Sequence, residues 1–166
     1  MSPIRLCCLL LSLLLLAQPE PARAQGFTLV GEEELRAEQR HQGTLSREEL
    51  DEPPMVTRSR FPAIRVVAPQ VDTSAAPAAP QLAPLRLQFE FETSSDARIL
   101  PQTFRALYGL LKLDVTEKLR RHAQLSERGI VAEGAGLPVG AHRLFIQVAD
   151  DRGRFTEREL RFRVGP

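Results

Sequence analysis

Apolar and polar residues alternate along the second half of the chain, as they do in β-strands with one buried face. In Leu85–Glu92 every second residue is Leu or Phe, and the residues between them are polar. Leu144–Val148 and Leu160–Val164 also place an apolar residue at every second position, and Asp150–Gly153 between them has the composition of a tight turn. The pattern therefore predicts a long strand followed, near the end of the chain, by a β-hairpin.

Weaker alternation predicts further strands in the same region. Ile64–Val67 indicates a strand that ends before Pro69, and Thr103–Thr116 indicates two strands with a turn at Gly109. The remaining expected elements are an extended Pro/Ala-rich connection over 74–84, a short helical turn over 117–123 and a strand at 130–132. About seven short strands over roughly 100 residues predict an all-β, immunoglobulin-like β-sandwich domain over residues 61–166. A small open barrel is the alternative.

Residues 25–60 are polar and predict an arm with short helices. Glu32–Glu34 favours a helix N-terminus, and Ser46–Glu49 fits a capping box before Pro53. Neither helix has a long apolar face, so we expect a loosely docked spacer. The alternative is that Phe27, Leu29 and Leu35 form an apolar patch for a partner.

Residues 1–24 resemble a secretory signal peptide. Arg5 precedes the apolar run Leu6–Ala17, and Ala22-Arg23-Ala24 supplies a small-residue cleavage site before Gln25. The run is shorter than the ~20 residues of a membrane-spanning helix. We expect export to the periplasm or the cell exterior, with no membrane insertion after cleavage.

Composition excludes several classes of function for the processed chain. Removal of residues 1–24 takes away Arg5, Arg23 and Glu20, which leaves equal numbers of acidic and basic residues and argues against nucleic-acid binding. Cys7 and Cys8 leave as well, so we expect no disulfide, thiol nucleophile or thiolate metal site. The chain has no Trp to provide a stacking platform for sugars.

The candidate residues for catalysis or metal binding form no recognisable set. None of the serines outside the leader lies in a Gly-x-Ser-x-Gly motif, and Glu90 and Glu92 lie on the polar face of one strand. Asp150 and Asp151 fit a turn better than a calcium loop. The histidines, which are His41, His122 and His142, lack metal-ligand spacing. We therefore predict that the chain is not an enzyme, and we assign no catalytic, cofactor-binding or metal-binding residue.

Several of these residues fit structural roles. Gly140 permits a sharp turn into a strand, and His142 lies where immunoglobulin-type sandwiches place a corner tyrosine bonded to the backbone. Asp150 is expected to accept hydrogen bonds from amides of its own turn, with Gly153 at positive φ. Thr116 is expected to bond across the sheet or to cap the turn at Glu117.

Two features of the last two strands suggest contact surfaces. Phe145 is out of phase with the inward residues, so we expect either an exposed aromatic at an interface or a residue covered by the arm. The final strand also carries a basic row, balanced in part by Glu157 and Glu159, which could bind an acidic partner or protect a sheet edge from aggregation. Its members are Arg154, Arg158, Arg161 and Arg163.

Phe61–Val164 resembles the bacterial Ig-like modules of secreted and surface proteins. The resemblance rests on the order of Thr103–Gly109, Leu113–Thr116, Leu137–Leu144 and Val148–Arg154. The chain is most similar to small proteobacterial exported proteins that carry one such domain and have no established role. The resemblance implies the fold and an exported setting, and it implies no catalytic residues.

Together these observations predict an exported, non-catalytic Ig-like module that contacts a protein partner or another component of the cell envelope. A carbohydrate- or peptidoglycan-binding domain is the alternative, which the lack of Trp disfavours.

Overall fold

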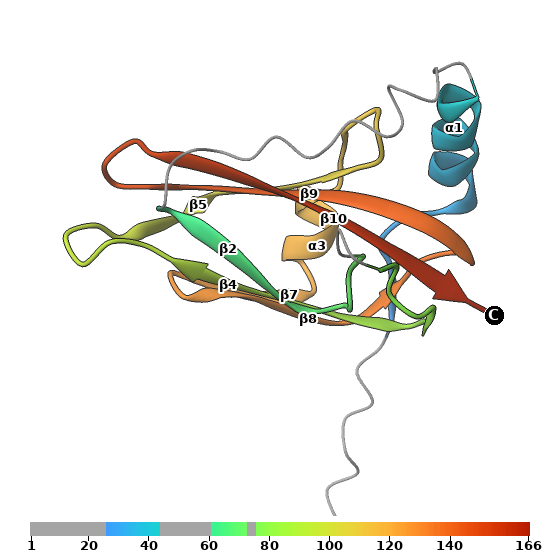
Figure 1. The fold of residues 1–166 in the computed structure, drawn as a ribbon, viewed down its shortest axis with the longest axis horizontal. Coiled ribbons are helices and arrows are strands. Elements are labelled where there is room, and N and C mark those ends of the chain that lie inside the picture. Colours follow the sequence, from blue (N-terminus) through green and yellow to red (C-terminus); the bar gives the residue numbers. More distant parts are fainter. Residues whose placement is uncertain (1–25, 44–60, 73–75) are drawn as a thin grey trace, which may run out of the picture.

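A computed structural model of the chain describes residues 26–43, 61–72 and 76–166. In these ranges the protein is an all-β sandwich of two five-stranded sheets, with helix α1 (Glu32–Gln42) at one end and the short helix α3 (Thr116–Arg120) between the sheets (Figure 1).

The first sheet, sheet A, is built on two central strands, β4 and β8. Its members are β1 (Phe27–Thr28), β2 (Ala63–Ala68), β4 (Leu85–Glu92), β7 (Ala123–Ser126) and β8 (Gly129–Gly136). The order is β1-β8-β4-β2, and β7 also pairs with β8. β1 runs parallel to β8, whereas the other pairs are antiparallel.

The second sheet, sheet B, is built on the hairpin of β9 and β10. Its members are β3 (Gln81–Leu82), β5 (Ile99–Tyr108), β6 (Leu113–Asp114), β9 (Gly140–Asp150) and β10 (Phe155–Gly165). The order is β3-β10-β9-β5-β6. The hairpin is in continuous register from Phe155 opposite Ala149 to Val164 opposite Gly140.

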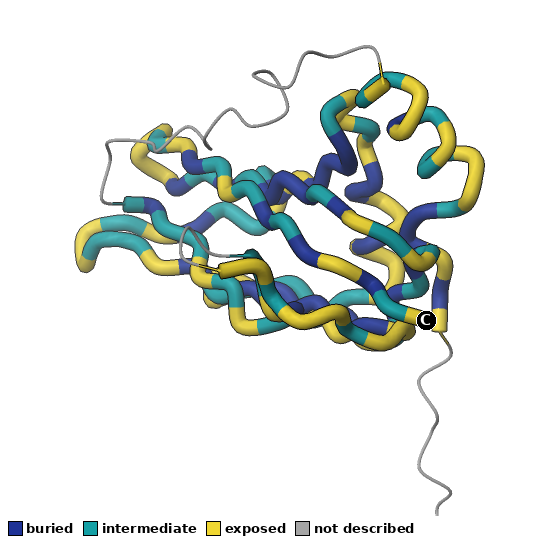
Figure 2. Tube along the Cα trace, turned by 45° about the vertical axis from the view of Figure 1, so that its right-hand side comes forward, coloured by how far each residue is buried: buried dark blue, intermediate teal, exposed yellow. Residues whose placement is uncertain are grey.

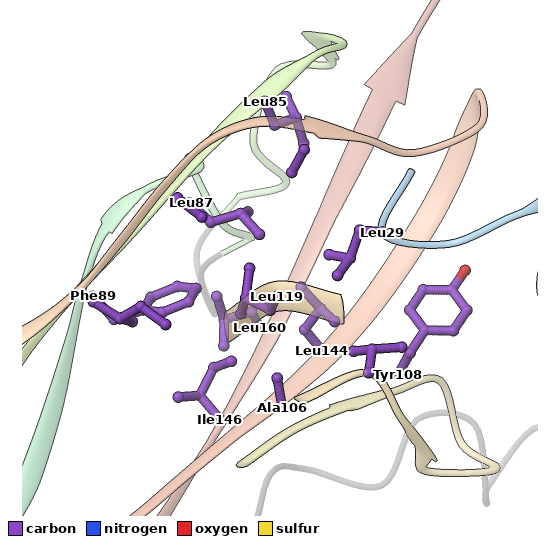
Figure 3. Packing of buried hydrophobic residues seen from close by; sticks show 14 of the residues in the cluster. Leu29, Leu85, Leu87, Phe89, Ala106, Tyr108, Leu119, Leu144, Ile146 and Leu160 are labelled. Carbon is purple, nitrogen blue, oxygen red and sulfur yellow. The ribbon is translucent and has the colours of Figure 1, made fainter. Parts of the chain in front are cut away.

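The core consists of the apolar faces of the two sheets, which lie against each other (Figure 2). Leu87 and Phe89 of sheet A point toward Ile146 and Leu160 of sheet B, and Leu119 of α3 lies among them (Figure 3). Each of these side chains is at most 1% exposed. The inward residues are those that the alternation predicts, because a period of two places them on one face.

The predicted strands are confirmed, and Leu85–Glu92 has the expected boundaries. β8 is longer than the predicted strand at 130–132, and α3 ends earlier than the predicted helical turn. The described residues form ten strands, where the sequence indicates about seven. The extra ones include β1 and β3, which have two residues each and are too short to show a period.

The first part of the expected arm differs from a loosely docked spacer. β1 pairs with β8, and Leu29 and Val30, which are at most 1% exposed, belong to the core. The apolar residues shortly before the helix, which are Phe27, Leu29 and Val30, therefore attach this segment to the core. The helix α1 itself has no broad apolar face. We call residues 26–42 the N-terminal segment.

Carboxylates of α1 complete the attachment of the N-terminal segment. The buried Glu38 accepts hydrogen bonds from the backbone N–H groups of Leu110 (2.6 Å) and Leu111 (3.3 Å) in the β5–β6 turn. Glu34 accepts one from the amide of Gly31 (2.6 Å) and forms an ion pair with Lys118 of α3. The hydrogen bond with Lys118 is the main cause that lowers the pKa of Glu34.

Two predictions concern segments outside the described residues: the signal peptide at 1–24 and the helix start at Ser46–Glu49. Within the part of the chain that the structure describes, no helix is long and apolar enough to cross a membrane.

Candidate functional site

The β9–β10 turn has the geometry expected of Asp150. Its Oδ1 accepts hydrogen bonds from the backbone amides of Arg152 (3.0 Å) and Arg154 (2.9 Å), and Gly153 has a φ of 73°. Oδ2 accepts a 2.7 Å bond from Nε of Arg154. Burial alone would raise the pKa of Asp150, but the hydrogen bonds to Arg154 and Arg152 outweigh it and lower the pKa. These contacts use the carboxylate to close the turn.

His142 is part of a buried hydrogen-bonded chain near the start of β9. Its Nε2 lies 2.8 Å from the carbonyl oxygen of Pro138, and its Nδ1 lies 3.0 Å from the hydroxyl of Tyr108. A carbonyl only accepts, so Nε2 carries the proton and Nδ1 accepts from Tyr108. Burial lowers the pKa of His142 and raises that of Tyr108, which keeps both groups neutral. The backbone bond expected of this histidine is present.

The other two histidines and the described serines lie outside β9. His41 lies in α1, and the exposed His122 stacks on Phe27 with ring centroids 4.2 Å apart. No group of three or more His, Cys, Asp or Glu among the described residues could hold a metal ion. Ser94 accepts a hydrogen bond from Arg154, and Ser126 bonds within its own turn. Ser46, Ser59 and Ser74 lie outside the described residues.

An open groove of about 510 Å³ runs along β5 beside α3. In it Arg105 forms a 2.7 Å ion pair with Asp114, and Thr116 bonds across to the backbone amide of Ala106 at 3.0 Å, as expected. The hydrogen bonds with Thr116 and Arg105 lower the pKa of Asp114 to about 2. The polar groups at its centre are therefore engaged with one another.

Of the two alternatives for Phe145, the exposed aromatic on the outer face of sheet B is wrong. Phe145 faces outward but is 7% exposed, and its cross-strand neighbour Leu107 is 8% exposed. The ammonium group of Lys112 lies 4.5 Å from the centre of the Phe145 ring. Cation–π attraction explains this contact, and Lys112 also bonds to Glu157 at 3.1 Å. The sequence left open whether Phe145 is exposed or covered, because alternation reports only the direction of a side chain.

Next to Phe145, two arginines share one carboxylate. Arg143 and Arg161 lie directly opposite each other in the β9–β10 ladder. Their Nε atoms lie 3.1 Å and 2.7 Å from the same Oε1 of Glu159. Burial lowers the pKa of Arg143; Glu159 acts against this, whereas the charge of Arg161 adds to it. We call Leu107, Phe145, Arg143, Arg161 and Glu159 the outer strip.

The four arginines of the basic row predicted on the final strand lie in different environments. Arg154 belongs to the turn before β10, Arg161 belongs to the outer strip, and Arg158 and Arg163 are exposed. β10 is also less of an edge than expected. Its last residues pair with β3, and the amide of Asp72 donates to the carbonyl of Arg161 at 2.7 Å.

Among the described residues, the two most exposed large apolar side chains flank the end of β10. Leu82 of β3, which pairs with Gly165, is 72% exposed. Val139, which is 59% exposed, directly precedes Gly140, the partner of Val164. The exposed Ala141 and Arg163 pair with each other beside them. We call Leu82, Val139, Ala141 and Arg163 the end patch. The sequence places Leu82 and Val139 in Pro-containing connections without periodicity, which gave no signal for this site.

Comparison with family models, with curated proteins and with solved structures finds no match for this chain.

Proposed function

We propose that this chain is an exported, non-catalytic binding module with an immunoglobulin-like domain, and that it contacts a protein partner through the end patch. The carrying observation is that Leu82, Val139 and Arg163 are all exposed around the end of β10, where Leu82 pairs with Gly165 and Val139 precedes the partner of Val164. Apolar residues next to arginine are typical of the composition of protein interfaces.

The order of the strands supports the immunoglobulin-like type. In sheet A it runs β2-β4-β8-β7, and in sheet B it runs β6-β5-β9-β10. Lettered along the chain without β1 and β3, these orders correspond to A-B-E-D and C′-C-F-G of immunoglobulin domains. His142 near the start of β9, bonded to the backbone four residues earlier, also fits the corner position of that fold.

The sequence supports export through its signal-peptide-like residues 1–24 and through the lack of Cys after them. A cell-envelope component other than a protein is the competing ligand for the same patch. The exposed groups of the patch are three aliphatic side chains and one guanidinium, which suits an acidic protein surface with an apolar anchor.

Site-specific photo-crosslinking in intact cells tests the proposal. A photoreactive residue replaces Val139 in one version and Glu133, an exposed residue of β8, in the control version. We expect one defined protein adduct from position 139, lost on Leu82→Ser with Arg163→Glu, and no such adduct from position 133. Adducts from both positions, adducts insensitive to the two substitutions, or no protein adduct at position 139 would contradict it.

A further inference from the structure

The first half of β10 is an unpaired edge of sheet B. Successive residues of a strand direct their backbone N–H and C=O groups to opposite sides. Arg161 directs its carbonyl away from β9, because that oxygen accepts the amide of Asp72. Phe155, Glu157 and Glu159 have the same orientation, since the β9–β10 ladder is in continuous register. Their backbone N–H and C=O groups bond to none of the residues that the structure describes. We call Phe155–Glu159 the open edge.

The other strand edges among the described residues are short or interrupted. β1, β3 and β6 have two residues each, and β7 has four. β2 and β5 each contain a bulge, and Pro101 lies in the bulge of β5. Short strands, bulges and prolines are devices that prevent an edge from adding another strand. The open edge has none of these devices, so its geometry allows a further strand to pair with β10.

One inward-pointing charge limits which strand can pair there. Thr156 and Leu160 are buried on the core side of β10, and alternation places Arg158 between them on the same side. Arg158 is nevertheless exposed, and it forms no ion pair with a described residue. A strand with an apolar residue opposite Arg158 would bury the guanidinium group without a counter-charge, which is unfavourable. A strand with a carboxylate at that position would form a charge-assisted pair instead.

The same charges argue against a second copy of the chain as the added strand. Two open edges paired with each other in an antiparallel ladder would set their acidic residues, Glu157 and Glu159, against one another. Like charges directly opposite each other destabilise a sheet. The added strand is therefore expected to come from a different protein.

Below the open edge, the side of the sandwich between β2 and β10 also offers apolar contacts. β2 and β10 lie at the edges of their sheets and contact each other. On the opposite side α3 lies against β5 and β7 and fills the space with the buried Leu119. Ile64 and Val66 of β2 pack against the core but are only partly buried. A strand added to β10 would cover these aliphatic side chains.

We propose that the open edge binds an extended segment of another protein, which pairs with β10 through its backbone. The segment places a carboxylate against Arg158 and an aliphatic residue over Ile64 and Val66. In this mode of recognition the backbone bonds provide affinity, and the side chains of alternate residues provide selectivity. The proposal does not rest on the end patch, which lies at the other end of β10.

A synthetic peptide of known sequence tests the proposal. The acetylated and amidated peptide Thr-Val-Thr-Glu-Thr-Val-Thr presents Val and Glu on one face in either chain direction. It is added at about 1 mM, and amide hydrogen exchange is followed by NMR. We expect the amides of Phe155, Glu157 and Glu159 to exchange about tenfold more slowly with the peptide. The amides of β7, an edge strand of sheet A, are the control and keep their rates.

A charge exchange at Arg158 tests the selectivity. In Arg158→Glu we expect the original peptide to lose its protective effect and the peptide with Lys in place of its central Glu to gain it. In the natural protein the Lys peptide is expected to bind about tenfold more weakly than the Glu peptide. Arg158→Gln is expected to bind both peptides equally. Circular dichroism checks the fold of each variant, and the comparison of the two peptides on the natural protein needs no substitution.

Methylation of alternate peptide nitrogens separates backbone pairing from attraction between charges. In a paired strand one alternate set of N–H groups faces its neighbour and the other set faces away. We therefore expect methylation of one set to abolish the slower exchange and methylation of the other set to preserve it.

Four results would overturn the inference. The first is unchanged exchange at the open edge, and the second is equal slowing at β7. The third is an equal effect of the two methylation patterns, which identifies binding without backbone pairing. The fourth is protection of the open edge that rises with protein concentration when no peptide is present, which identifies a second copy of the chain as the added strand.

Discussion

Leu29→Ala distinguishes an N-terminal segment built into the core from a spacer attached to a finished domain. Leu29 is 0% exposed and lies between the sheets beside Tyr108 and Leu144 (Figure 3). Its backbone N–H donates to the carbonyl of Gly136 at 2.9 Å, and alanine keeps that bond. The substitution therefore removes only the buried side-chain atoms.

The expected loss follows from the cost of emptying a core site. Leu→Ala at a fully buried position lowers the free energy of unfolding by about 2–5 kcal/mol. For Leu29 we expect a loss of about 3 kcal/mol, near the middle of this range. With a urea m-value of about 2 kcal/mol/M, the midpoint falls by about 1.5 M. Urea titration followed by far-ultraviolet circular dichroism measures this shift.

Leu82→Ala is the matched control, because it makes the same chemical change at a residue that is 72% exposed. Its free energy of unfolding is expected to stay within about 0.5 kcal/mol of that of the natural protein. Equal midpoints for Leu29→Ala and Leu82→Ala would refute the assignment of the N-terminal segment to the core.

Three further predictions concern the buried polar groups. Glu38→Ala leaves the amides of Leu110 and Leu111 without their acceptor and lowers the free energy of unfolding by about 2 kcal/mol. Glu33 is exposed, so Glu33→Ala is expected to change the free energy of unfolding by almost nothing in the same urea titration. Tyr108→Phe leaves the Nδ1 of His142 without its donor and costs about 1–3 kcal/mol; a loss no larger than that of an exposed substitution would contradict the hydrogen-bonded chain. Burial lowers the pKa of His142 below its ordinary 6.5, so the unfolded chain binds the proton more readily and stability falls as pH drops below about 6.5. Thermal unfolding between pH 5 and 7 measures this slope, which we expect to flatten in His142→Gln and to persist in His122→Gln.

The main strands were predictable because each of them packs one face into the core and carries mostly polar residues on the other. In such a strand an apolar residue recurs at every second position, and the sequences of β4, β9 and β10 show this period of two directly. The turn residues Asp150 and Gly153 were predictable for a similar reason, since a tight turn needs local hydrogen bonds and a positive φ that few residue types supply.

The N-terminal segment, the outer strip and the end patch were not predictable in the same way. Leu29 and Val30 are two apolar residues in a charged stretch, and only the gap between the sheets next to β8 makes them core residues. The direction of Phe145 followed from alternation, but its burial did not. Leu82 and Val139 lie far apart in the sequence and flank the end of β10 only because β3 and β9 both pair with it.

The sequence by itself determined the β-class, the inward faces of the long strands, the closing turn and the structural place of His142, because each depends on neighbours within a few residues. The tertiary structure alone decided what covers each face and which distant residues share a surface. Those outcomes depend on contacts between segments that can lie more than a hundred residues apart, such as β1 and β8, and no local pattern encodes such contacts.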